Sequence, residues 1–339
     1  MEVKKDVHEI IQKSKSIIIL VSRPLDHDGI TSAIVLRNYL KKKKKFVDVY
    51  STRKITSKFL SLPYIEVVKV KDPRKMNLLE YDLVIALDGG NKRQFSCVEK
   101  DDEFNFSGNP NVLNIDHHLT NTHFASFEIW DPKASSTAQV LINSIIDIER
   151  IDEDDATLLY IGIVGDTGNF RYSFNGLTLE IASKLVKRGA DYLYAVNMYM
   201  NNYNKVDFEI YAYLIKSTVY KLKSGYCYVI ADYEKISVKF NCLIENIKDS
   251  IYLYETCFAC AVKGIKFSLV LTRDREMINV SMRGNSLNNK IPLPEIGCEF
   301  DKSSGGHFNS SGFRIKGEIN TVLQNLDKVI KEFKLKYES

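Results

Sequence analysis

Long apolar runs and an N-terminal secretion signal are both absent from this sequence of 339 residues. The longest purely aliphatic run covers residues 17–21, far short of the ~20 apolar residues that a membrane-spanning helix requires. Residues 1–6 are mostly polar and lack the apolar core of a signal peptide. We therefore expect a cytoplasmic protein that does not contact a membrane.

A strong excess of one charge is absent as well. The 47 Lys and Arg residues nearly balance the 43 Asp and Glu residues, which leaves a net charge of +4. So small an excess disfavours wrapping around a long nucleic acid, because such binding neutralises many phosphates at once. It is compatible with a local basic pocket for a small anion. The lysine run 41–45 is interpreted as the solvated C-terminal end of a helix.

Cysteines are few and scattered, and a chain of this size does not need disulfides. Cys257 and Cys260 form a lone C-x-x-C pair, a pattern found in redox sites and in halves of zinc sites. No second pair and no histidine follows at a zinc-like spacing, and the neighbouring residues are apolar. We expect two buried, reduced thiols.

Short apolar runs rich in β-branched residues alternate with helical stretches in the first half of the chain. Such runs fit strands buried on both faces, the pattern of a parallel sheet. Residues 31–45 predict one of the intervening helices, and the alternation favours a doubly wound, mainly parallel α/β domain. The predicted strands cover residues 16–22, 46–51, 64–70, 82–87 and 111–115.

The remainder of the chain predicts a helical connector and a second, smaller α/β domain. Helical stretches run from about residue 177 to residue 223, and strand-like segments return after Gly225. We place the first domain at residues 1–185, the connector at 186–225 and the second domain at 226–339. Predicted elements of the second domain are strands 226–231, 267–272 and 277–282 and a closing helix at 320–336.

Acidic and histidine side chains stand where four of the apolar stretches end. Residues 26–29 (Asp-His-Asp-Gly), Asp88 and residues 116–118 (Asp-His-His) each follow a predicted strand. Asp166 follows an apolar helical stretch. Because ligand sites of parallel α/β sheets lie at the carboxyl ends of the strands, these side chains are expected to converge on one cleft.

Carboxylates gathered in one cleft favour a metal centre. A single aspartate after a strand is often only a turn residue or a helix N-cap. Several together repel one another and raise each other's pKa, and divalent cations remove that repulsion. Oxygen ligands with an imidazole suit Mn²⁺ or Mg²⁺, and two such ions ~3.5–4 Å apart can clamp a phosphate. Asp88 is the natural bridging ligand, because it follows a central strand.

The ordered set of motifs resembles the DHH phosphoesterase superfamily over about residues 16–318. The resemblance implies a DHH catalytic domain followed by a DHH-associated substrate-binding domain. The matching segments are residues 26–32 in a RecJ-like form, Asp88, residues 116–118 with Asn121, residues 162–170 in the form of NrnA-like oligoribonucleases and nucleotide phosphatases, and the glycine-rich histidine signature at 305–313.

The resemblance also implies two metal ions, expected to be Mn²⁺ with Mg²⁺ as the alternative. Asp26 and Asp88 would hold the first ion. The second ion would be held by Asp28, Asp88, His117 and Asp166.

One position departs from the family pattern. NrnA-like members and members that cleave cyclic dinucleotides usually carry a histidine four residues before Asp26, where this chain has Ser22, although RecJ-like members also lack it. The departure predicts a weaker first metal site in which water or another side chain replaces the imidazole. His27 stands between two ligands and is expected to point elsewhere.

Contacts with the substrate are implied by the same resemblance. His118 would contact the scissile phosphate, and Asp116 would support the neighbouring imidazoles. Arg283 would grip a substrate phosphate, for which guanidinium is a natural bidentate partner. Backbone amides of the glycine-rich signature would approach a nucleotide closely, and its residues are Gly305, Gly306 and His307.

The expected reaction is attack of a metal-bound hydroxide on a short nucleotide substrate: cyclic di-AMP, its linear product pApA, or a short oligoribonucleotide. Alternatives are a 3′-phosphatase acting on adenosine 3′,5′-bisphosphate and a non-catalytic nucleotide-binding protein, to which Ser22 lends some support. A RecJ-like nuclease for long strands is disfavoured because it normally carries an extra OB-type domain. The glycine-rich signature disfavours an inorganic pyrophosphatase, and a homodimer is expected only from the resemblance.

Overall fold

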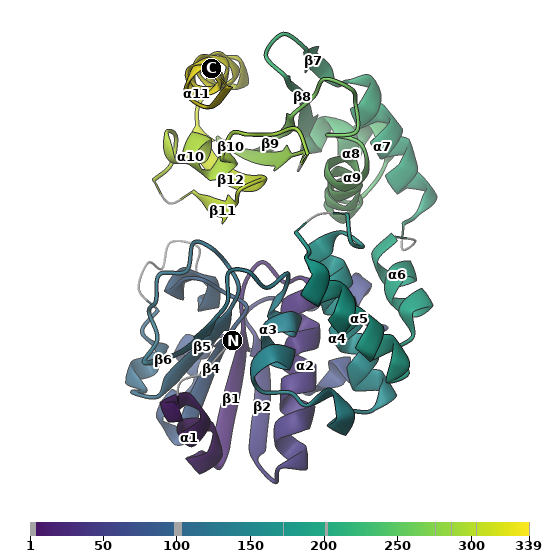
Figure 1. Ribbon diagram of the computed structural model, residues 1–339. Coiled ribbons are helices and arrows are strands. Elements are labelled where there is room, and N and C mark those ends of the chain that lie inside the picture. The colour runs from purple at the N-terminus through teal and green to yellow at the C-terminus, as the bar shows by residue number, and fades with distance from the viewer. Residues whose placement is uncertain are drawn as a thin grey trace. The chain divides into compact units, whose positions relative to one another are not determined.

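The computed structural model describes residues 5–97, 104–171, 173–200, 203–274, 276–285, 287–302 and 304–338. The chain divides into two compact units, Met1–Asn202 and Tyr203–Ser339, and each is described by itself (Figure 1). The division falls inside the stretch 186–225 for which the sequence predicts a connector, and the limits of that connector stay a prediction. Within the described residues, no helix combines the length and the apolar character needed to cross a membrane.

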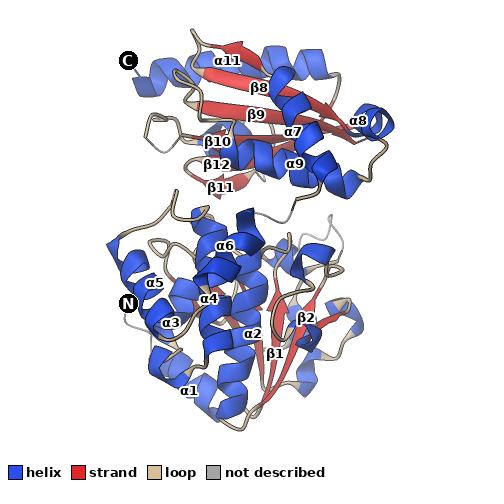
Figure 2. Cartoon of the chain, turned by 90° about the vertical axis from the view of Figure 1, so that its right-hand side faces the viewer, coloured by secondary structure: helices blue, strands red, loops and turns tan. Residues whose placement is uncertain are grey.

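A six-stranded parallel sheet forms the centre of the first unit (Figure 2). Its strand order is β3-β2-β1-β4-β5-β6, so the order reverses between β1 and β4. Ligands of such sheets bind outside the carboxyl ends of the strands at that reversal. The strands are β1 (Ser16–Val21), β2 (Phe46–Ser51), β3 (Val68–Val70), β4 (Leu83–Leu87), β5 (Val112–Asp116) and β6 (Phe127–Trp130).

Successive residues of the central strand β1 serve two different cores. Ile17 and Ile19 pack in the core that contains α2 and α4, two helices that lie side by side over one face of the sheet (Figure 2). Ile18 and Leu20 point to the opposite face, where Phe95 and other aromatic side chains cover them. The helices are α1 (Lys5–Lys13), α2 (His27–Lys42), α3 (Thr137–Ser144), α4 (Glu153–Thr167), α5 (Gly176–Lys187) and α6 (Tyr192–Met200).

The predicted α/β fold with a parallel sheet is confirmed, and some element boundaries differ. The predicted strand 64–70 contains only β3, because Tyr64 has a left-handed φ of 59° and a 3-10 turn, Ile65–Val67, precedes the strand. The helix predicted at 31–45 ends at Lys42, and basic side chains fill its last turn as expected. Strand β6 was not predicted, because its four residues alternate too briefly to give a clear pattern.

The second unit is built on a mixed sheet of order β11-β12-β10-β9-β8-β7. Strands β8 and β9 pair in parallel, and the other neighbours pair antiparallel. Phe267 and Leu269 of β9 pack with α10 and α11, whereas Val270 packs on the opposite face with α7 and α9. The elements are α7 (Lys205–Lys216), β7 (Val219–Lys221), β8 (Tyr226–Asp232), α8 (Tyr233–Phe240), α9 (Ile244–Cys257), β9 (Phe267–Asp274), β10 (Met277–Gly284), α10 (Leu293–Cys298), β11 (Gly305–His307), β12 (Ser310–Lys316) and α11 (Ile319–Glu338).

Cys257 and Cys260 are reduced thiols that do not form a disulfide, and both are half-buried rather than fully buried as expected. The thiol of Cys260 lies 3.0 Å from the carbonyl oxygen of Arg283, and burial raises its pKa to about 11. A thiol with so high a pKa stays protonated and unreactive near neutral pH.

Candidate metal centre

The first acidic motif lies where β1 turns into α2. Asp26 caps this helix, because its Oδ1 accepts a hydrogen bond from the backbone N–H of Gly29 at 2.9 Å. Asp28 is fully buried in the first turn and accepts backbone N–H bonds from Thr137 at 2.6 Å and Ala138 at 3.0 Å. The N-terminus of α3, where free N–H groups favour negative charge, therefore holds Asp28.

Asp88 follows β4 and occupies the middle of the group. Its φ of 59° is unusual for a residue other than glycine. Its buried Oδ1 accepts a hydrogen bond from the hydroxyl of Thr137 at 2.8 Å. A Cβ at Gly29 would lie 2.8 Å from Oδ2 of Asp88, and one at Gly162 would lie 2.7 Å from Oδ1 of Asp28. Glycine at these two positions therefore lets the carboxylates approach helices α2 and α4 closely.

His117 and Asp166 meet where β5 ends beside the last turn of α4. Nε2 of His117 lies 3.0 Å from Oδ2 of Asp166 and 3.8 Å from Oδ1 of Asp88. Nδ1 of the same ring lies 3.4 Å from the carbonyl oxygen of Ala134. A carbonyl that holds one ring nitrogen orients the imidazole and leaves the other nitrogen to face a metal. His117 thus presents Nε2 to the aspartates.

Asp116 and His118 form a tight pair, with Oδ1 of Asp116 2.6 Å from Nδ1 of His118. The other carboxylate oxygen accepts a hydrogen bond from the side-chain amide of Asn121 at 2.7 Å. Although burial acts to raise the pKa of Asp116, the hydrogen bond from His118 lowers it overall. The indole N–H of Trp130 donates to the carbonyl of His118 at 2.8 Å, so both the ring and the backbone of His118 are held.

Burial and mutual repulsion raise the pKa of three carboxyl groups. Burial and then the charge of Asp166 raise the pKa of Asp28 to about 7. Burial and then Asp26 raise the pKa of Asp88 well above its usual range, and burial and then Asp28 raise that of Asp26. Burial lowers the pKa of His117, but its hydrogen bond to Asp166 outweighs this and raises the pKa to about 9. The group therefore retains protons at neutral pH unless a cation replaces them.

Among the residues that the structure describes, two sets of donor atoms are close enough together to hold a metal ion. One set is Asp88, His117 and His118, and the other is Asp28, His117 and Asp166, with the donor atoms of each set within 4.8 Å of one another. Carboxylate oxygens with imidazole nitrogen suit hard and borderline divalent cations. The residues present therefore fit a divalent metal.

Asp26 belongs to neither donor set, but it lies beside them. A Cβ atom added at Gly29 would lie 3.4 Å from Oδ1 of Asp26 and 2.8 Å from Oδ2 of Asp88. The two carboxylates therefore approach the same point beside α2. Ser22, at the position where a family histidine is usual, is buried and donates its backbone N–H to Leu87 at 3.2 Å.

His27 does not take the place of the missing histidine. Its ring packs edge-on against Phe59, with ring centroids 5.1 Å apart, and belongs to neither donor set. Burial and then the charge of Lys58 lower its pKa to about 3, so the ring is neutral at physiological pH. This agrees with the expectation that His27 points elsewhere.

Arg283 and the glycine-rich signature lie in the second unit. Nη1 of Arg283 donates to the hydroxyl of Ser310 at 2.8 Å, and Nη2 lies 3.4 Å from Oε2 of Glu255. Ser310 pairs with Arg283 on one side and with His307 on the other, so the three residues form one row across β10, β12 and β11. The side chain of His307 lies outside the described residues, whereas the backbone of Gly305–His307 forms β11.

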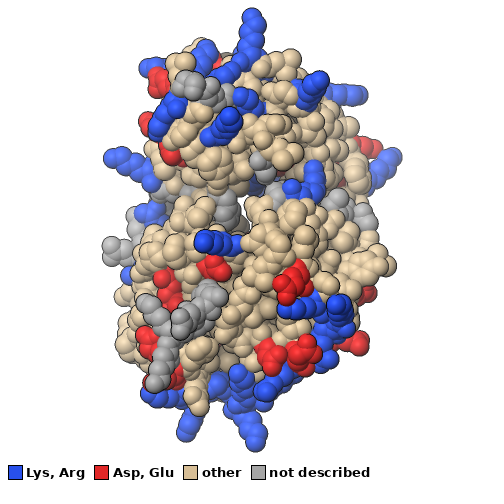
Figure 3. All heavy atoms as spheres, viewed as in Figure 1, with Lys and Arg blue, Asp and Glu red and all other residues tan. Residues whose placement is uncertain are grey.

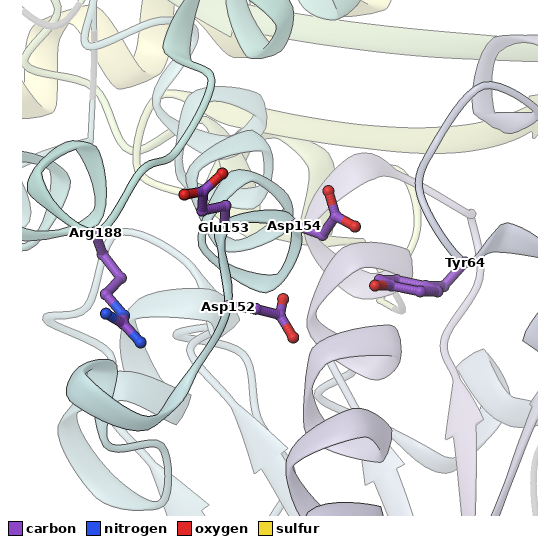
Figure 4. A pocket seen from close by; sticks show the side chains of 5 residues that line it. All are labelled: Tyr64, Asp152, Glu153, Asp154 and Arg188. Carbon is purple, nitrogen blue, oxygen red and sulfur yellow. The ribbon is translucent and has the colours of Figure 1, made fainter.

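A polar hollow lies at the opposite end of α4 from the metal centre. Asp166 is in the last turn of α4, about 18 Å from the first turn at 1.5 Å per residue. The hollow therefore does not belong to the metal centre. Its volume is about 510 Å³, and its lining residues are Tyr64, Asp152, Glu153, Asp154 and Arg188 (Figure 4).

Comparison with known proteins relates part of the first unit to a known family. Residues 16–163 match the DHH family, N-terminal domain. A probable bifunctional oligoribonuclease and PAP phosphatase NrnA from Streptococcus mutans is 31% identical over 161 residues, which cover 47% of this chain and 49% of that protein. The cyclic-di-AMP phosphodiesterase PdeA from Listeria monocytogenes is 24% identical over 214 residues, covering 61% of this chain and 30% of that protein. The chain thus spans half or less of these relatives.

A solved structure supports the fold over the whole chain. The crystal structure of an exopolyphosphatase-related protein from Bacteroides fragilis superposes with a TM-score of 0.84 at 21% identity, and covers 98% of this chain and 97% of that one. At this identity the likeness shows the fold alone. What relates this chain to the DHH family, N-terminal domain, is the match of residues 16–163.

Proposed function

We propose that this chain is a metal-dependent phosphodiesterase that hydrolyses short nucleotide substrates. The observation that carries the proposal is the convergence of Asp28, Asp88 and Asp166 around Nε2 of His117. The relatives named above, an oligoribonuclease with PAP phosphatase activity and a cyclic-di-AMP phosphodiesterase, support nucleotide phosphoesters as the substrate class.

The first unit supplies the metal ligands in this proposal. Asp26 and Asp88 would hold one divalent ion, and Asp28, Asp88, His117 and Asp166 would hold a second, with Mn²⁺ the proposed metal. Such ions, when bound, neutralise charge on phosphoryl oxygens and make water a better nucleophile. Asp88 is the ligand common to the two proposed sites, and its Oδ1 lies 3.8 Å from Nε2 of His117, which belongs to both donor sets.

The remaining residues would bind and orient the phosphate. His118, fixed at Nδ1 by Asp116, keeps Nε2 for a phosphoryl oxygen. Arg283 would offer its guanidinium to a second oxygen or a neighbouring phosphate, and Glu255 limits its motion. In β11, Gly305 and Gly306 lack side chains, so the backbone of that strand would allow close approach of a nucleotide.

The distribution of charge supports a short substrate. Lys and Arg side chains are dispersed over the face seen in Figure 3, with Asp and Glu among them, in keeping with the net charge of +4 (Figure 3). A long strand gains its affinity from many phosphate contacts along a basic surface, whereas one or two phosphates need only a metal centre and a few cations.

A product analysis tests the proposed reaction. The protein is incubated with Mn²⁺ and separately with cyclic di-AMP, pApA, a five-nucleotide RNA and adenosine 3′,5′-bisphosphate, and the products are resolved by chromatography. Cleavage of cyclic di-AMP, pApA or the short RNA supports the phosphodiesterase. Nucleotide binding without turnover of any of the four substrates would contradict it and favour a binding protein.

Release of phosphate from adenosine 3′,5′-bisphosphate would add a second activity. The Streptococcus mutans relative carries both activities in its name, which favours this phosphatase as the second candidate function. Cleavage of this substrate alone, with the other three left intact, would make the phosphatase the main activity.

The two metal sites are expected to differ in affinity. Ser22 offers no imidazole to the site of Asp26 and Asp88, so fewer protein ligands hold that ion. We expect a calorimetric titration of the metal-free protein with Mn²⁺ to show two classes of site that differ in affinity. Two sites of equal affinity would contradict the assignment of a weakened first site.

Replacing Arg283 with alanine is expected to raise KM about 10- to 100-fold without changing Mn²⁺ affinity. A charge-assisted hydrogen bond contributes about 1.5–3 kcal/mol, and Arg283 lies in a different unit from the metal ligands. Steady-state kinetics and a Mn²⁺ titration measure the two effects. Arg273→Ala, on neighbouring strand β9, is the matched control, and an equal rise in its KM would argue against a specific role for Arg283.

A further inference from the structure

Thr137 contacts two carboxylates of the metal centre at once. Its backbone N–H donates to Oδ2 of Asp28 at 2.6 Å, and its hydroxyl donates to Oδ1 of Asp88 at 2.8 Å. The side chain is fully buried. These bonds connect α3 with the motifs that follow β1 and β4, 109 and 49 residues away in the sequence.

The position of Thr137 in its helix explains why both groups are available. Ser136 is the N-cap of α3 and its side chain accepts from the N–H of Gln139, so Thr137 is the first residue of the helix. The N–H at that position has no acceptor within the helix. Asp28 supplies the acceptor instead, and the hydroxyl of Thr137 is turned toward Asp88.

Three other buried threonines of this unit use their hydroxyls differently. The hydroxyls of Thr31, Thr157 and Thr167 each donate to the carbonyl oxygen four residues earlier in their own helices, at 2.8, 2.8 and 2.6 Å. That local bond is the common one for threonine in a helix. The hydroxyl of Thr137 instead bonds to a carboxylate of the donor set formed with His117 and His118.

We propose that Thr137 is a positioning residue for the metal centre, a role that rests on the proposed function. Its hydroxyl fixes the orientation of the Asp88 carboxylate and stabilises its ionised form, while its N–H does the same for Asp28. Hydrogen bonds that orient metal ligands typically change metal affinity by about 10- to 100-fold when removed. Because Asp88 is the ligand shared by both proposed sites, loss of the hydroxyl weakens both.

Thr137→Val tests this role, because valine keeps the shape and the backbone N–H but removes the hydroxyl. Free Mn²⁺ is counted by electron paramagnetic resonance during titration of the metal-free protein, with no substrate present. We expect T137V to bind Mn²⁺ about 10- to 100-fold more weakly than the wild type. T137S, which restores a hydroxyl, should recover most of the affinity. T157V, which removes a buried hydroxyl at the far end of α4, should bind as the wild type does.

The outcomes separate this role from the proposed function. If the wild type and T137V bind Mn²⁺ with equal affinity, the proposed role of Thr137 is overturned and the assignment of the metal centre stands. Failure of the wild type to bind Mn²⁺ would overturn the metal centre itself. Circular dichroism of the metal-free variants checks folding, and if T137V is unfolded, T137A takes its place with the same expected loss. Equal losses in T137V and T157V would point to a general packing effect and overturn the proposal.

Discussion

Replacing Asp88 with asparagine is expected to lower the turnover of every cleaved substrate by at least about 100- to 1000-fold, the loss typical when one preorganised electrostatic group is removed. Asparagine keeps the size of the side chain and can still accept the hydroxyl bond of Thr137. It removes the negative charge that both proposed metal sites share. The effect should appear in kcat, and added Mn²⁺ should restore little of it.

The control for this variant is another buried aspartate of the same unit. Asp155 is fully buried near the start of α4, where its carboxylate accepts hydrogen bonds from Asn38 at 2.8 Å and Lys42 at 3.1 Å. Asp155→Asn should lower stability but leave kcat within a few-fold of the wild type. Retained activity in D88N, or an equal loss in D155N, would contradict the role of Asp88 as a shared metal ligand.

Mn²⁺ is expected to raise the melting temperature far more at pH 8 than at pH 5. The pKa of Asp28 is raised from 3.8 to about 7 in the folded protein, and that of His117 from 6.5 to about 9. Because the folded state then binds more protons than the unfolded state, the metal-free protein loses stability as pH rises between about 4 and 9. Mn²⁺ must displace these protons, so its affinity rises across the same range.

The size of this shift follows from mass action. At 100 times its dissociation constant, an ion stabilises the folded state by about 2.7 kcal/mol per site. For a unit of about 200 residues this corresponds to roughly 5–10 °C. Thermal unfolding followed by circular dichroism, with Mn²⁺ and with a chelator, measures it at both pH values. D28N should flatten the pH dependence, whereas D155N should keep it. A Mn²⁺ shift that is equal at pH 5 and pH 8 would contradict the assignment.

The sequence predicts the position of the aspartates well because the sheet places them. Three of the four acidic motifs follow an apolar run that is buried on both faces, and such runs are strands of a parallel sheet whose carboxyl ends share one edge. Asp88 after β4 and Asp116 at the end of β5 lie at that edge for this reason. The residue pattern also predicts that Asp166 reaches this cleft, although it follows a helical stretch, and in the fold it approaches from α4 and lies 3.0 Å from Nε2 of His117.

Thr137 and Trp130 were not predicted, because their roles depend on contacts far apart in the sequence. The run Ser135-Ser136-Thr137 indicates a helix start, and nothing in it shows that the helix points at Asp28. Trp130 is the only tryptophan of the chain and lies on β6, a strand too short to recognise. Its bond to the carbonyl of His118 depends on the pairing of β6 with β5.

The neutral state of His27 also comes from the tertiary structure. In the sequence it stands between two aspartates, whose negative charge favours a protonated imidazole, although this position also predicts that the ring points away from the metal. In the fold its ring turns to Phe59, and burial beside Lys58 keeps it neutral. Burial of this kind depends on residues that the local motif does not contain.

The most direct test of the central claim is anomalous diffraction from crystals of the protein grown with Mn²⁺. The account predicts anomalous peaks within bonding distance of Asp28, Asp88, His117 and Asp166, with the peak beside Asp26 the weaker. The account would be contradicted if no anomalous peak lies among these residues, or if the only peak lies in the polar hollow lined by Asp152 and Asp154.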